Sequence, residues 1–400
     1  MKIQLASKAF AKALIEVQSS ISTKSTIFAL ENILMSRDSA GCFFLTGGSA
    51  DRMATVPLEA TLIEGKFSPI LLPLSVIPKI SGLSSPTITL SFTEGNNGSG
   101  NMKVEFFGGD FSIAVAGGKE YPVLNFDATI PEGRQECLFM RIPVKTFKSI
   151  IKSASPFCAY EVLRLVMNGI CFDVSFGGCI FVSTNGHALF KYSYEPSQDK
   201  ELMEGVMFSN FLASDQYIFD DSHVKPLLTV LNRVEDDKII LVEFGSNSIR
   251  FSVDQRTFVC RRTEGKFPNY NAVIPKNGDK SVNVNRNEFA SRLRYISLFS
   301  STSNNLIALT FKPEDLTLEA EDVDFGTKGK DTLAVQEANN IPASGVKIGV
   351  NAGTAIDVFN ALPGAEATMV FSDPLRPVVV RPSDPSSPVT TLMMPMRIND

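Results

Sequence analysis

The chain repeats itself three times, and each repeat is as long as a domain. A strand-like segment leads each time into a helix whose first strong apolar anchor is a phenylalanine: Phe10, Phe147 and Phe289. These anchors lie about 140 residues apart, a spacing that excludes the short units of a solenoid. The strand-like segments before them are residues 3–5, 138–142 and 282–284. The pattern predicts three similar domains in a row.

Each repeat contains two helix candidates, recognised by apolar residues at i, i+3 or i+4, and i+7. In the second repeat, for example, Phe147, Ile150 and Ile151 would share one face. The six candidates are residues 7–18, 74–81, 143–154, 224–233, 286–296 and 352–362. Strand-like runs rich in Val, Ile, Phe and Thr follow the second helix of each repeat, at 87–92, 239–244 and 368–371. Each repeat is therefore predicted to be an α+β domain with its helices on one face of a sheet.

The ends of the first two repeats are also alike. Gly118-Lys119-Glu120-Tyr121-Pro122 resembles Gly265-Lys266-Phe267-Pro268, and each is followed by Ile-Pro and a polar stretch. We therefore expect domains at residues 1–131, 132–276 and 277–400. Gene triplication alone could produce such repetition, although repeated domains most often build pseudosymmetric assemblies.

Charge is unevenly distributed along the chain. The six predicted helices carry eleven basic and three acidic side chains, net +8, in a chain of net charge −5. Basic helices would suit a surface that faces phosphates, but solvated helix faces also favour lysine in general. No zinc finger or helix-turn-helix pattern predicts sequence-specific base contacts. The helix-borne candidates for phosphate contact are Lys8, Lys12, Lys79, Lys145, Lys148, Lys152, Lys225, Arg233 and Arg292.

The sequence offers no catalytic motif. No phosphate-binding glycine loop, nucleophile elbow or metalloprotease helix is present. Cys179 and His187 could be imagined as a thiol and its base, but a predicted strand would hold them too far apart. We expect no enzyme activity, no cofactor and no metal site, because the two histidines and six cysteines lack metal-ligand spacing.

We expect a cytoplasmic protein. The chain has neither a long apolar run nor a signal-peptide pattern at its start. Its cysteines form no CxxC pair and are expected to be reduced and mostly buried.

Three short motifs resemble those of one family, the bacterial DNA sliding clamp or beta subunit of DNA polymerase III. The first is Val182-Ser183-Thr184-Asn185-Gly186-His187-Ala188-Leu189. The second runs from Gly265 through Pro268-Asn269-Tyr270 to Val273-Ile274-Pro275. The third is Met394-Pro395-Met396-Arg397-Ile398 near the end of the chain. The motifs occur in the family's order, and with the three repeats the resemblance covers the whole chain.

The resemblance implies a head-to-tail homodimer that forms a closed ring, with helices lining the hole and sheets outside. Such a ring encircles double-stranded DNA without reading its sequence, and tethers the replicative polymerase for processive synthesis. It also implies that the clamp loader, other polymerases and repair proteins bind through short linear motifs, and that the protein is nucleoid-associated. The alternative is a non-enzymatic, peptide-binding dimeric scaffold that does not encircle DNA.

The resemblance also implies three sets of site residues. The partner-peptide pocket would consist of Met167, Thr184, Gly186, His187, Leu189, Pro268, Val273, Leu375, Leu392, Met393, Met394, Pro395, Met396 and Arg397. Lys24 and Arg164 would join the helix cations that face DNA. The dimer interface would include Phe111, Ile113, Leu298, Phe299, Glu319 and Glu321. The chain departs from the family pattern at Asn185 and Ala188, where Asp and Arg are common, and has small residues at Ala272 and Thr354.

Overall fold

The computed structural model describes residues 1–22, 24–95, 99–126, 138–175, 178–195, 215–275 and 278–398. These residues form two compact units. The first comprises Met1–Lys148 and Ser222–Arg262, and the second holds the remaining described residues. Both predicted domain boundaries, 131/132 and 276/277, lie outside the described residues.

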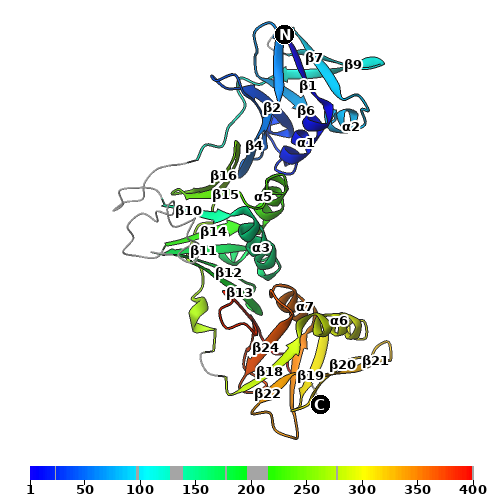
Figure 1. The fold of residues 1–400 in the computed structure, drawn as a ribbon, viewed down its shortest axis with the longest axis vertical. Coiled ribbons are helices and arrows are strands. Elements are labelled where there is room, and N and C mark those ends of the chain that lie inside the picture. Colours follow the sequence, from blue (N-terminus) through cyan, green and yellow to red (C-terminus); the bar gives the residue numbers. More distant parts are fainter. Residues whose placement is uncertain are drawn as a thin grey trace. The chain divides into compact units, whose positions relative to one another are not determined.

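The threefold repeat is visible in the order of the elements (Figure 1). In each repeat a strand runs directly into a helix, several strands follow, and a second helix precedes three more strands. The strand–helix pairs are β1 (Lys2–Ala6) with α1 (Ser7–Gln18), β10 (Leu138–Pro143) with α3 (Val144–Ala154), and β18 (Lys280–Asn285) with α6 (Arg286–Ser297). The second helices are α2 (Val76–Ser81), α5 (Val224–Leu231) and α7 (Ala352–Asn360). The predicted α+β architecture is confirmed.

The first unit contains a sheet of thirteen strands, in the order β10-β15-β16-β17-β4-β3-β2-β6-β9-β8-β7-β1-β5. Antiparallel pairing of β17 with β4 makes the strands of two repeats continuous. Its strands, besides β1 and β10, are β2 (Asn32–Arg37), β3 (Phe43–Gly48), β4 (Arg52–Leu58), β5 (Ala60–Glu64), β6 (Ile70–Pro73), β7 (Thr87–Glu94), β8 (Gly100–Phe106), β9 (Gly109–Gly117), β15 (Ile239–Phe244), β16 (Ser248–Val253) and β17 (Arg256–Arg261).

The second unit contains two sheets. Nine strands follow the order β14-β11-β12-β13-β26-β25-β24-β18-β22, and four follow the order β21-β20-β19-β23. The nine-stranded sheet holds β11 (Gly169–Ser175), β12 (Gly178–Thr184), β13 (Ala188–Tyr194), β14 (Asp215–Asp220), β22 (Glu337–Asn339), β24 (Glu366–Phe371), β25 (Val378–Pro382) and β26 (Val389–Met393), with β18. The four-stranded sheet holds β19 (Leu306–Phe311), β20 (Asp315–Asp322), β21 (Thr327–Ala334) and β23 (Val346–Asn351).

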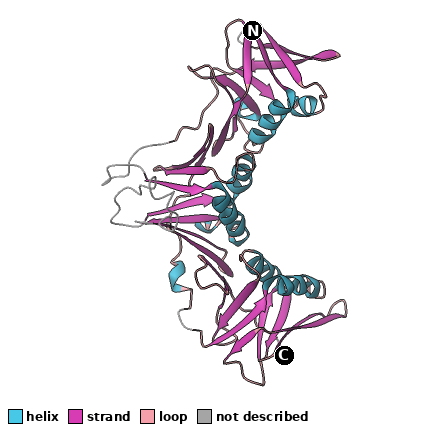
Figure 2. Ribbon diagram, viewed as in Figure 1, coloured by secondary structure: helices cyan, strands magenta, loops and turns pink. Residues whose placement is uncertain are grey.

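Each helix buries one apolar face and exposes a polar one, as the periodicity predicts. On α1, Phe10, Leu14 and Val17 are fully buried, whereas Lys8 and Lys12 are exposed. In the second unit α6 and α7 lie together on one side of the sheets (Figure 2). The rings of Phe289 on α6 and Phe359 on α7 have their centroids 4.5 Å apart.

Four predicted helices extend one or two residues beyond the observed ones, two at the N-terminal end and two at the C-terminal end. Helix α2 begins at Val76 rather than at residue 74, which places Pro78 in its first turn, where a missing N–H costs no hydrogen bond. Helix α5 ends at Leu231. Arg233 therefore follows that helix and is not part of it. Its side chain is exposed, as expected for a residue that contacts phosphate.

Candidate functional site

The three motifs meet around the pairing of β13 with β26, which joins the second and third repeats within the second unit. Leu189 lies opposite Leu392 in this ladder. Both side chains are buried and pack in one apolar cluster with Val379, Phe267 and Tyr270. Since alternate residues of a strand point to opposite faces, this cluster marks one face of the sheet. We call it the loop-covered face, because residues 267–274 lie over it.

The turn between β12 and β13 is fixed by its own hydrogen bonds. The Asn185 carboxamide oxygen accepts from the backbone N–H of His187 at 2.9 Å and of Ala188 at 2.8 Å. Gly186 has φ +85°, a conformation that side-chain-bearing residues rarely adopt. Asparagine thus supplies the turn-forming acceptor where the family commonly has aspartate. The turn holds His187 exposed at the rim, and Met167 lies 3.8 Å from where a Gly186 Cβ would be.

The loop after Gly265 is held down by a buried tyrosine. The Tyr270 hydroxyl donates to Asp173 Oδ2 at 2.8 Å, and the Tyr270 ring lies 5.9 Å below the Lys191 ammonium. Burial and the bond to Asp173 raise the pKa of Tyr270 well above its ordinary value, so the hydroxyl keeps its proton. This anchor leaves Pro268 and Val273 exposed beside the apolar cluster.

The C-terminal segment runs along the same junction. The Met394 N–H donates to the His187 carbonyl at 2.8 Å, and the Met396 N–H donates to the Gly349 carbonyl at 2.8 Å. Methionines here would offer adaptable apolar surface. Met393 differs from its neighbours: it pairs with Ala188 and is fully buried. Alternation places it on the face opposite Leu392, so we leave Met393 out of the proposed pocket.

The expected pocket residues therefore divide into a floor and a rim. Met167, Leu189 and Leu392 are buried and form the floor. The rim includes two large apolar side chains that remain in solvent, Val273 at 50% and Leu375 at 71% exposure. The other rim residues are Thr184, Gly186, His187, Pro268, Met394, Pro395, Met396 and Arg397. An apolar floor with an exposed apolar rim is suited to an apolar peptide.

The candidate DNA-facing cations differ in how far neighbouring acids neutralise them. Lys8, Lys12 and Lys225 are exposed on their helices, and so are Lys24 and Lys79. On α3, Lys145 and Lys152 are exposed. Lys148, by contrast, pairs with Asp236 at 2.7 Å, and its side chain is only 16% exposed. Arg164 lies 3.8 Å from Glu161.

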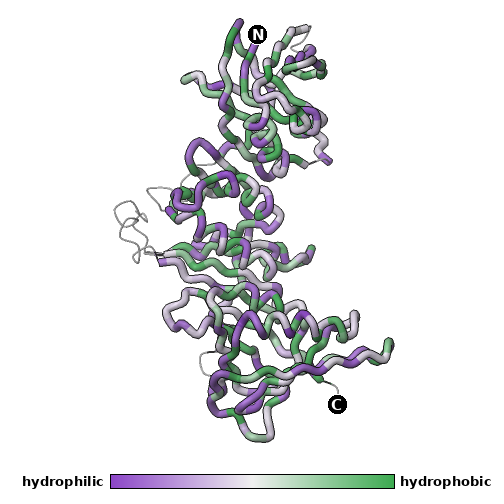
Figure 3. The backbone as a smooth tube through the Cα atoms, turned by 45° about the vertical axis from the view of Figure 1, so that its right-hand side comes forward, coloured by the Kyte–Doolittle hydropathy of each residue, from purple (hydrophilic) through white to green (hydrophobic). Residues whose placement is uncertain are grey.

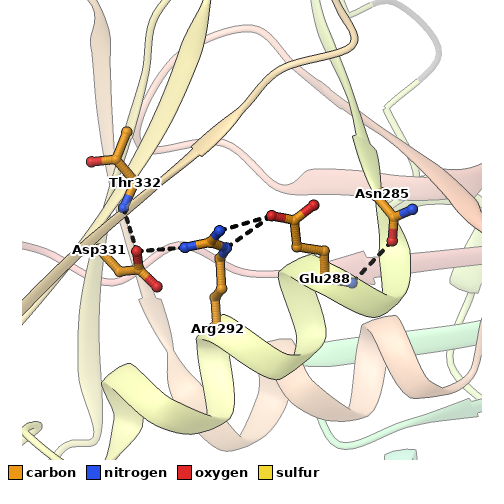
Figure 4. Close-up of polar contacts among 5 residues, drawn as sticks. All are labelled: Asn285, Glu288, Arg292, Asp331 and Thr332. Carbon is orange, nitrogen blue, oxygen red and sulfur yellow. Dashed lines mark hydrogen bonds and ion pairs between the residues drawn. The ribbon is translucent and has the colours of Figure 1, made fainter.

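Arg292 is the most completely neutralised of these cations (Figure 4). Its guanidinium bonds Glu288 at 2.8 Å and Asp331 at 2.6 Å. Glu288 is itself positioned at the start of α6, where its N–H bonds the Asn285 side chain at 3.0 Å. These bonds raise the pKa of Arg292. With two carboxylates on one guanidinium, little net positive charge remains for a phosphate.

Two of the candidate interface residues, Phe111 and Ile113, lie beside a free strand edge. Strand β9 pairs with β8 along its length, but with β6 only at Ala116 and Gly117, which leaves one edge free beside Phe111 and Ile113. Strand β21 is the end strand of the four-stranded sheet. Free edges of this length invite pairing with another chain.

The two candidate interface acids on β20 are each paired with a lysine of β21. Lys330 pairs with Glu319 and Lys328 with Glu321, both at 3.0 Å across the β20–β21 hairpin. Asp322 is buried and accepts from the N–H groups of the turn. In Figure 3 the arms of this hairpin are largely hydrophilic.

No reactive centre emerges from the part of the chain that the structure describes. Burial raises the pKa values of the Cys158, Cys171 and Cys179 thiols well above normal, which keeps them protonated and unreactive. Among the described residues, no group of three or more His, Cys, Asp and Glu side chains could hold a metal ion. Nor is any described helix long and apolar enough to cross a membrane.

Comparison with known proteins agrees with the motifs. Residues 271–397 match the family described as DNA polymerase III beta subunit, C-terminal domain. The beta sliding clamp of Caulobacter vibrioides is 24% identical over 414 aligned residues, which cover 100% of both chains. The comparisons indicate a bacterial sliding clamp. This confirms the resemblance drawn from the sequence.

Solved structures of sliding clamps share the fold. The DNA polymerase III subunit beta from Pseudomonas aeruginosa matches with a TM-score of 0.84 at 20% identity, over 100% of both chains. A P. aeruginosa sliding clamp bound to griselimycin matches with the same TM-score, identity and coverage.

Several residues that shape these surfaces were missed by sequence reasoning. Asp173, Asp236 and Asp331 each engage a residue that the sequence did single out or quote, but from 39 to 97 positions away. Tyr270, the partner of Asp173, was not among the predicted site residues either. It could have been found from the sequence, because it belongs to the second motif.

Proposed function

We propose that the chain is a DNA sliding clamp: two copies close head to tail into a ring around duplex DNA and tether the replicative polymerase. The observation that carries this proposal is the full-length match to a beta sliding clamp. The threefold repeat of elements in the structure, which the sequence predicted, supports it. The ring has no catalytic site of its own and acts in the cytoplasm on the nucleoid.

The exposed lysines of α1, α2, α3 and α5 support contact with DNA. None of Lys8, Lys12, Lys145, Lys152 and Lys225 has a carboxylate of the described residues within ion-pair distance. Such cations attract phosphates whatever the base sequence. A closed ring needs no tighter contact, because its closure prevents dissociation.

The free edges of β9 and β21 support dimerisation. In the proposed ring, the β9 edge of one copy, with Phe111 and Ile113, meets the third repeat of the other. Leu298 is 76% exposed at the end of α6, and Phe299 follows it. These two side chains would receive the apolar residues of β9, and pairing would cover both edges.

The first experiment compares retention on nicked circular and linearised plasmid after loading by a clamp loader, at high salt. A threaded ring stays on circles and slides off linear ends, whereas electrostatic binding is lost from both as salt rises. Equal, salt-sensitive loss from both DNAs would refute encirclement. A dimer that still bound peptides would then be a scaffold.

The partner pocket is tested with griselimycin, because a sliding clamp has been crystallised with it. We expect saturable binding that Val273→Asp weakens at least tenfold, because the bound ligand would bury the new carboxylate against apolar surface. The matched control is Ile63→Asp, which changes a similarly exposed side chain on β5. Equal affinity of both variants would place the ligand elsewhere.

A further inference from the structure

A cavity of about 260 Å³ lies on the loop-covered face, beside the proposed pocket. Its walls come from β24, β25 and the chain segments next to them. The residues used below are Pro275, Val370, Ser372, Pro377, Val379 and Arg381. The sequence analysis assigned none of them to a site.

The cavity and the proposed pocket adjoin the same apolar cluster. Val379 belongs to the apolar cluster that contains Leu189 and Leu392, and Val370 packs against that cluster. At the rim, Pro275 is two residues from Val273. Leu375 lies on the short loop whose ends, Ser372 and Pro377, line the cavity. A peptide that covers Val273 and Leu375 would thus pass the mouth of the cavity.

One cationic side chain, Arg381, lines this cavity. Arg381 shares the loop-covered face of β25 with Val379, since the two are separated by one residue. Among the described residues, no carboxylate lies within ion-pair distance of Arg381, and its side chain is exposed. The neighbouring Arg376 differs, because it pairs with Asp373 at 3.3 Å. Arg381 is therefore the cation here whose charge is available to a ligand.

One wall of the cavity depends on a glycine, Gly278. A Cβ on Gly278 would collide with Val370 Cγ1 and would lie 3.3 Å from the Phe371 backbone. A side chain at position 278 would therefore push into the wall of the cavity. The space that remains is enough for one side chain, not for a second folded element.

We propose that this cavity holds an acidic side chain of the partner peptide, with Arg381 as its counter-ion and Val370 and Val379 contacting its methylene groups. The inference rests on the proposed partner pocket and deepens it. Partners of this protein would carry an aspartate or glutamate at a fixed distance from the apolar residues that fill the pocket. Charge complementarity with Arg381 and the position of the cavity beside the pocket select this occupant.

The test begins with a random 12-residue peptide library displayed on phage, selected against the whole protein and eluted with griselimycin. We expect an apolar pair with Asp or Glu at one fixed offset. Selection on Arg381→Glu should replace that acid with Lys or Arg, whereas selection on Arg376→Glu should leave it unchanged. Apolar peptides without a positioned acid would overturn this inference and leave the pocket intact. Failure to select any peptide that griselimycin displaces would overturn the pocket itself.

Affinity then measures the contact. A selected peptide and its Asp→Asn or Glu→Gln form should differ about threefold in Kd at low salt, the range of an exposed ion pair. The difference should vanish in Arg381→Ala and persist in Arg376→Ala. A difference that persists in Arg381→Ala would show that the acid binds elsewhere. The Arg381→Ala protein must still bind griselimycin, which shows that it is folded.

Discussion

Helix α3 allows a quantitative test of which cations face DNA, because its three lysines are not equivalent. Lys145 and Lys152 are exposed, whereas Lys148 is neutralised by Asp236 at 2.7 Å. A lysine that neutralises one phosphate contributes about −0.9 to the slope of log K against log salt concentration. Replacing Lys145 and Lys152 by alanine should flatten that slope by about 1.8, whereas Lys148→Ala should change it far less.

The magnitude is large enough to measure. Between about 50 and 200 mM salt, a slope change of 1.8 corresponds to about a twelvefold difference in the loss of affinity. The assay is fluorescence anisotropy of a labelled short linear duplex, onto whose open ends a ring can thread. Asp236→Asn is the matched control, since it frees Lys148 and should steepen the slope by up to about 0.9. If Lys148→Ala flattened the slope as much as the double variant, ion pairing would not decide which cations act.

Three further predictions follow from single contacts. Arg256→Met should destabilise the first unit by about 3 kcal/mol at neutral pH, because it strands the buried Glu16 carboxylate, while Glu16→Gln should cost less. Burial already raises the pKa of Glu16, so the stranded carboxylate becomes protonated as the pH falls toward 4.5. The stability lost in Arg256→Met, measured by urea unfolding, should therefore become smaller over that range, and a pH-independent loss would contradict this. Iodoacetamide at mildly alkaline pH should modify Cys42 first among the described cysteines, as read by mass spectrometry, because the others are buried; early labelling of a buried thiol would show that the fold opens. Gly329→Ala should weaken the dimer about tenfold by ultracentrifugation, since its Cβ would lie 2.5 Å from the Phe299 ring; an unchanged Kd would remove Phe299 from the interface.

Periodicity predicted the helices well because each lies over a buried face. The predicted range 7–18 matches α1, since Phe10, Leu14 and Val17 mark that face without interruption. The C-terminal end of α5 was harder to place, because no glycine or proline follows Leu231 to stop the helix. Arg233 therefore looked like a helix residue. The Arg233 side chain is nevertheless exposed, as contact with phosphate requires, whether or not the residue belongs to the helix.

The site was predictable only as far as its motifs are local. Residues 184–188 form a turn that the Thr184 and Asn185 side chains stabilise by hydrogen bonds within it, so a short motif suffices to recognise it. The loop over the apolar cluster depends instead on Asp173, which is 97 positions from Tyr270. Likewise, the cavity beside Arg381 exists only because β24 and β25 pair and residues 275 and 278 come close to them. The spacing of residues along the sequence does not predict contacts between segments that are so far apart in the chain.

Net charge along the sequence overstates how basic the helices are. Lys148 and Arg292 count fully in a sequence sum, yet each is paired with an acid from a distant segment. In a protein that must bind DNA tightly, this neutralisation of cations would lower the affinity. In a ring around DNA it is an advantage, because closure prevents escape while each additional phosphate contact slows sliding. Pairing some cations and exposing others sets a weak, sequence-independent attraction. It follows that freeing Lys148 by Asp236→Asn should tighten binding but slow diffusion along the duplex.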